Sequence, residues 1–109
     1  MEDNIFKNNV KEIVSYFTNN EFELAIFKAN EIKEQLLNTD EIEFIDCLIN
    51  VIKATSIINS NGDLKEAYKL LLDSYNKLRS FRPFYKGLKL ENFINSIQES
   101  IAEIKNYIN

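Results

Sequence analysis

The densest group of chemically active side chains in this 109-residue sequence is a basic and aromatic segment, residues 77–89. Five cations fall within these thirteen residues, which contain no Asp or Glu. Such a composition is typical of contact with phosphate groups, with an aromatic ring stacked on a base. The cations are Lys77, Arg79, Arg82, Lys86 and Lys89, and the rings that could stack are Phe81, Phe84 and Tyr85.

The same basic segment has a structural interpretation. Its aromatic rings would be buried against the protein, and its cations would complement a helix C-terminus and an acidic body. The chain has a net charge of −4, and outside this segment eight cations face seventeen Asp and Glu residues. Because an acidic surface repels phosphate, the structural interpretation is favoured. RNA or nucleotide binding by this segment is the alternative.

Carboxylates are the remaining candidates for catalysis or metal binding. The sequence has no histidine and a single cysteine, Cys47. These counts exclude His-based catalysis, Ser-His and Cys-His pairs, and zinc sites built on imidazole or several thiolates. We therefore expect no metal, no cofactor and no enzymatic activity, with Cys47 as a small core residue. The carboxylates weighed for a site are Glu12, Glu21, Glu31, Glu34 and Asp46, and Asp46 is expected to be paired or at an edge.

A row of isoleucines near the C-terminal end could join two copies of the chain. Their spacing alternates between three and four residues, which is a heptad seam of about two repeats. Such a seam would form a homodimer or pack on its own bundle, and the second interpretation is favoured. The residues are Ile94, Ile97, Ile101, Ile104 and Ile108.

Helical periodicity must position all of these side chains. Apolar residues recur every three or four positions over five segments, and no segment alternates in the way that a strand does. Two glycines and one proline leave few turns. The predicted helices cover about Asn4–Thr18, Glu21–Leu37, Ile42–Ile58, Leu64–Leu78 and Glu91–Tyr107.

The third and fourth predicted helices form a hairpin, residues 40–80, around which the chain is organised. The third helix is apolar on nearly every side and should lie in the middle of a bundle. Asp40 with Glu43 suggests its capping box, Asp63 should cap the fourth helix, and Gly62 should take a positive φ at the turn. Asp3 is expected to cap the first helix, and Asn19-Asn20 is expected to end it, since Asn suits both a left-handed C-terminal position and an N-cap. The prediction is an all-α antiparallel bundle of about five helices, in one domain, residues 1–109.

Several of these features occur in the same order in a known family. They are Asn20-Glu21-Phe22, the apolar stretch Phe44–Ile58, Gly62-Asp63 followed by Ala67, Leu70 and Leu71, and the loop Phe84–Leu90. This order resembles domain of unknown function 309, a small helical prokaryotic family, over residues 20–104. The resemblance implies a helical fold, and the family has no established activity to carry over to this chain. Where that family carries His, Glu and a second Glu, this chain has Ile26, Phe27 and Asn30.

The function expected from the sequence is that of a non-enzymatic helical protein that self-associates or binds a protein partner. No apolar run reaches the roughly 18 residues that span a membrane, and the acidic start differs from a signal peptide. A lone cysteine fits a reducing compartment, so a soluble cytoplasmic protein is expected.

Overall fold

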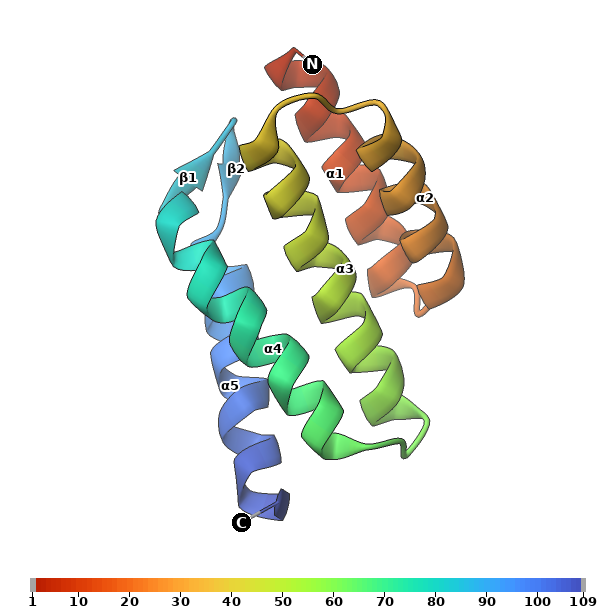
Figure 1. Cartoon of the computed structure of the whole chain (residues 1–109), viewed down its shortest axis with the longest axis vertical. Coiled ribbons are helices and arrows are strands. Elements are labelled where there is room, and N and C mark those ends of the chain that lie inside the picture. Colours follow the sequence, from red (N-terminus) through yellow and green to blue (C-terminus); the bar gives the residue numbers. More distant parts are fainter. Residues whose placement is uncertain (1, 109) are drawn as a thin grey trace.

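The computed structural model describes residues 2–108 and contains five α-helices in that range. Helix α3 runs through the middle, with α1 and α2 on one side and α4 and α5 on the other (Figure 1). The molecule measures 43 × 27 × 21 Å. The predicted all-α bundle is confirmed. The helices are α1 (Asp3–Thr18), α2 (Phe22–Glu34), α3 (Thr39–Asn59), α4 (Leu64–Leu78) and α5 (Glu91–Ile108).

The central position predicted for the apolar third helix is confirmed. Helix α3 packs on α2 and on α4, and it supplies more buried side chains than any other helix of the described chain. Successive helices alternate in direction, so α1, α3 and α5 run the same way (Figure 1). Short turns join α1 to α2, α2 to α3 and α3 to α4, and the longer segment 79–90 joins α4 to α5. The buried apolar residues of α3 are Phe44, Ile45, Cys47, Leu48, Ile49, Val51, Ile52 and Ala54.

The helix N-termini follow the predictions in part. The Asp63 carboxylate accepts a hydrogen bond from the Lys65 amide at 2.9 Å, so the predicted cap of α4 is confirmed. The cap of α3 is Asn38 and not Asp40: its side-chain oxygen accepts from the amides of Asp40 and Glu41 at 2.8 and 3.1 Å. The α3 helix thus begins earlier than predicted, because Asn can fill the same role. Helix α1 already includes Asp3, so that residue is not its N-cap.

The turn between α3 and α4 differs from the prediction in one residue. Asn61 has the positive φ, 57°, while Gly62 follows it and donates its amide to the Ile57 carbonyl at 2.8 Å. This is a Schellman ending in which Asn takes the left-handed position. A Cβ on Gly62 would lie 3.0 Å from Ile57 Cγ2, so the glycine provides space instead. The predicted break at Asn19-Asn20 is confirmed: α1 ends at Thr18, and Asn20 takes the left-handed position with φ 62°.

The segment between α4 and α5 contains the one departure from an all-helical chain within residues 2–108. A short 3₁₀ helix (Arg79–Phe81) leads to the extended Arg82 and then to a hairpin of β1 (Phe84–Tyr85) and β2 (Leu88–Lys89). Phe84 pairs with Lys89, and Tyr85 pairs with Leu88. Lys86 and Gly87 form the turn with φ values of 49° and 82°. A two-residue strand is too short to show alternation in the sequence, so the prediction of no strands was wrong here.

Candidate functional site

Two cations of the basic segment pair with acidic side chains at the surface. Lys77 Nζ lies 3.3 Å from Asp73 Oδ2, one helical turn earlier on α4. The Arg82 guanidinium donates to both oxygens of Glu91, at 2.9 and 2.7 Å, at the start of α5. These contacts raise the pKa of Lys77 and of Arg82, and Arg82 lowers the pKa of the Glu91 carboxyl. Both cations therefore already have an anion of their own chain.

A third cation, Lys86, points inward from the hairpin turn. Its Nζ lies 3.1 Å from Oε2 of Glu41 and 3.3 Å from Oδ1 of Asp3. It also lies about 6 Å from the ring centroids of Phe6 (6.0 Å) and Tyr85 (5.8 Å), which adds cation–π attraction. The adjacent Glu41 carboxylate raises the pKa of Lys86. The lysine thus compensates a buried charge, because the Glu41 side chain is only 1% exposed.

The aromatic side chains of the basic segment are mostly used for packing. Tyr85 lies 4.7 Å from Phe81 and 5.1 Å from Phe44, measured between ring centroids. Burial raises the pKa of the Tyr85 hydroxyl. Phe84 points the other way and is 62% exposed. Of the residues considered for phosphate or base contact, the ones without an ion pair or a ring contact within residues 2–108 are Arg79, Lys89 and Phe84.

The isoleucine seam of α5 faces its own bundle. Ile94, Ile97 and Ile104 are buried, while Ile101 and Ile108 are half-buried and pack against the same core. Helix α5 packs on α4. A second copy of the chain could reach this seam only at its half-buried members. Pairing of two copies through the seam stays a prediction.

The carboxylates considered for a catalytic or metal site are dispersed. Asp46 Oδ1 pairs with Lys33 Nζ at 2.7 Å at the edge of α3, and Lys28 lies within 3.5 Å of Glu12 and 3.2 Å of Glu31. Glu21 and Glu34 are exposed. Within residues 2–108, no group of three or more His, Cys, Asp or Glu side chains is arranged to hold a metal ion.

The buried carboxylate of this protein is Glu41, which the sequence interpretation missed. It precedes the apolar run of α3 and looks like an ordinary acidic residue in a first helical turn. Its counter-ion Lys86 is distant in the sequence, so no local pattern could reveal the pair. Cys47, by contrast, is buried as predicted, and burial raises the pKa of its thiol to about 12.

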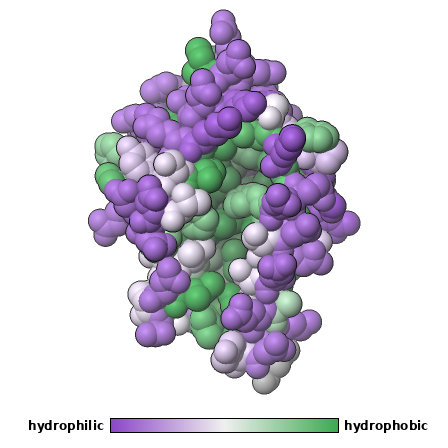
Figure 2. Space-filling model, turned by 180° about the vertical axis from the view of Figure 1, so that it is seen from behind, coloured by the Kyte–Doolittle hydropathy of each residue, from purple (hydrophilic) through white to green (hydrophobic). Residues whose placement is uncertain are grey.

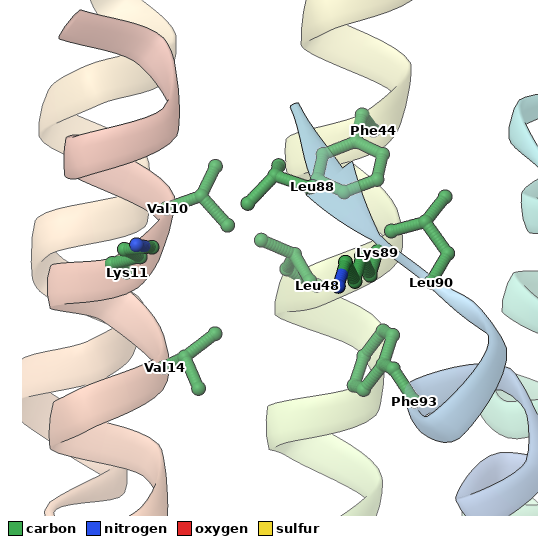
Figure 3. A pocket seen from close by; sticks show the side chains of 9 residues that line it. All are labelled: Val10, Lys11, Val14, Phe44, Leu48, Leu88, Lys89, Leu90 and Phe93. Carbon is green, nitrogen blue, oxygen red and sulfur yellow. The ribbon is translucent and has the colours of Figure 1, made fainter. Parts of the chain in front are cut away.

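An apolar groove on the opposite face from the view of Figure 1 is a further feature that the sequence did not reveal. Figure 2 shows apolar side chains along the middle of this face, bordered by hydrophilic ones. The upper part of the groove is a pocket of about 260 Å³. Its lining residues are Val10, Lys11, Val14, Phe44, Leu48, Leu88, Lys89, Leu90 and Phe93 (Figure 3).

Four elements, α1, α3, β2 and α5, contribute to this pocket. Val10 and Val14 come from α1, and Phe93 with the β2 residues comes from the opposite side (Figure 3). Phe44 and Leu48 of α3 form the floor. A smaller hollow continues along α3, where Phe17 of α1 and Val51 and Ile52 of α3 join the lining.

The groove exists because α1 and α5 pack on different neighbours. Helix α1 packs mainly on α2, and α5 packs mainly on α4. The face of α3 between them is left uncovered by a helix. The stripe Val10–Val14 has the spacing of an ordinary core face, and Val14 is nevertheless 37% exposed. Sequence periodicity shows that such residues lie on the apolar face of a helix. It does not show which of them a neighbouring element covers.

Comparison with known proteins adds no assignment. No family model matches the chain, and neither a curated protein nor a solved structure matches it. The resemblance to domain of unknown function 309 therefore stays a prediction. Of the positions where the chain departs from that family, Phe27 is 66% exposed on α2. No helix in the described part of the chain is both long and apolar enough to cross a membrane.

Proposed function

We propose that this protein is a non-enzymatic binding module whose groove, between α1 and α5, receives an amphipathic helix of a protein partner. The groove carries this proposal, because its apolar lining forms a hollow over α3 that is open to solvent at Val14, which is 37% exposed. Figure 2 shows apolar side chains along the middle of this face. Recognition of a helix in a groove uses apolar side chains repeated every three or four residues.

The length of the groove suits a helix of about four turns. Its floor residues on α3 run from Phe44 to Ile52, and a further hollow beside Ile58 and Ile104 lies farther along. The distance from Phe44 to Ile58 along the helix is about 21 Å at 1.5 Å per residue. A partner helix of about four turns, or about 15 residues, would cover that length.

The lining favours a partner with an apolar face over a substrate. Seven of the nine side chains around the pocket are apolar, and the other two are lysines at its sides. The pocket has no acidic lining residue that could act as a general base, and Cys47 is not part of it. We propose a protein partner in preference to self-association, because the isoleucine seam is already largely buried in its own bundle.

A designed peptide of about 15 residues tests the proposal. It carries leucines at helical spacing on one face and glutamines elsewhere. We expect binding that shifts the methyl NMR signals of Val10, Val14 and Leu48. Val14→Glu should weaken binding by at least about tenfold, since it places a charge on the groove wall.

Leu72→Glu is the matched control. Leu72 is 36% exposed on α4, nearly the same as Val14, and it does not line the groove. This variant should bind the peptide as the wild type does. If no helical peptide binds, or if both variants bind equally well, the groove is not a helix-binding site and the proposed function is wrong.

A further inference from the structure

Two lysines stand on opposite sides of the apolar groove. Lys11 belongs to α1, and Lys89 belongs to β2 on the other wall (Figure 3). Both are exposed, and neither has an ion pair among residues 2–108. The linings of the pocket and of the adjoining hollow contain no Asp or Glu. In the upper part of the groove an occupant would therefore meet positive charge from a lysine on each flank, whereas Glu103 lines the hollow at the far end.

This arrangement differs from the other cations nearby. Lys86, on the same hairpin as Lys89, is held by Glu41 and Asp3. Arg82 is held by Glu91. Lys86 and Arg82 thus have acidic partners within the chain, whereas Lys89, which lines the groove, has no ion pair among residues 2–108.

We infer that the partner helix carries acidic residues on both sides of its apolar stripe, one flank facing Lys11 and the other facing Lys89. The inference rests on the proposed function and names the charge of the partner. In an amphipathic helix the residues beside the apolar stripe lie at its two edges, where long lysine side chains reach them. Such rim charges raise the association rate and select between partners more than they raise affinity.

Three peptides with the same apolar stripe of about 15 residues test the inference. Their flanking positions carry Glu, Gln or Lys, and binding is measured at low and high salt. For the wild type we expect the order Glu, then Gln, then Lys, with about tenfold between the Glu and Lys peptides. The difference should shrink as salt is raised, because exposed charges are screened.

The double variant Lys11→Glu, Lys89→Glu should reverse this order. The control is Lys65→Glu with Lys69→Glu, which changes the net charge equally at exposed positions of α4 outside the pocket. It should keep the wild-type order. If the groove variant also keeps that order, the lysines do not select the partner and the inference is wrong.

The outcomes separate the inference from the proposed function. Equal binding of all three peptides, still abolished by Val14→Glu, would overturn the acidic partner and leave the helix-binding groove standing. Absence of binding by every peptide would overturn both. Tighter binding of decanoate than of any peptide would identify an anionic lipid as the occupant, and would overturn the inference.

Discussion

The basic segment, residues 77–89, and the apolar groove are neighbours that share β2, yet they use their side chains in opposite ways. The segment 77–89 is the richest in charge and aromatic rings, and most of those groups contact other residues of the same chain. The groove is built from ordinary valines, leucines and phenylalanines, of which Val14, Leu88 and Phe93 stay partly exposed. The density of reactive groups in a sequence therefore does not indicate which of those groups are available to a partner.

The availability of the groove can be compared directly with the closed core by thiol labelling at pH 8. Burial raises the pKa of Cys47 to about 12, against about 8.5 for an exposed thiol. The cysteine introduced by Val14→Cys, in a Cys47→Ala background, should react with iodoacetamide about a thousandfold faster than native Cys47. Unfolding in urea should remove the difference. Similar rates in the folded proteins would mean that the groove wall is closed.

The two lysines of the hairpin provide the second comparison. Lys86→Met leaves the buried Glu41 carboxylate without its closest cation, so it should lower the free energy of unfolding by about 2 kcal/mol. Lys89→Met should change it by less than about 0.5 kcal/mol, because Lys89 has no ion pair among the described residues. Urea unfolding measures both. Equal losses would show that Lys86 has no special structural role.

Alkaline pH should lower the free energy of unfolding, because Lys86 and Tyr85 of the hairpin have raised pKa values in the folded protein. The pKa of Lys86 is raised in the folded protein, so its stabilising contribution is complete below the ordinary lysine value of about 10.4. That contribution is lost as pH rises through the raised value. The raised pKa of Tyr85 acts in the same direction, from about pH 10. The stability of the wild type should fall more than that of Lys86→Met between about pH 9 and about pH 11. A parallel fall in both proteins would contradict this.

Removal of the exposed Arg82–Glu91 ion pair should have the smallest effect on the free energy of unfolding. Arg82 and Glu91 are both at the surface, where ion pairs contribute little to folding. Arg82→Gln should leave the urea midpoint nearly unchanged while the pKa of Glu91 rises toward its ordinary value. An NMR titration of the Glu91 carboxyl measures this. An unchanged Glu91 pKa would show that the pair does not form in solution.

The sequence was sufficient to predict most of the fold, because helix periodicity and capping are local. The fourth helix, with its Asp63 cap, was predicted at its observed limits, and the burial of Cys47 followed from its place on an apolar helix. The hairpin strands were missed because two residues show no alternation. In the candidate site, the apolar character of Val10 and Val14 was visible in their spacing, but their exposure to a groove was not.

By itself, the sequence determined five helices, their order and the central place of the most apolar one. These properties depend on neighbours within a few positions along the chain. The tertiary structure alone decided that Lys86 neutralises Glu41 while Lys89 stays free. It also decided that α1 and α5 pack on different helices and leave an apolar hollow over α3 between them. Both outcomes depend on contacts between residues far apart in the sequence, whose partners no local pattern specifies.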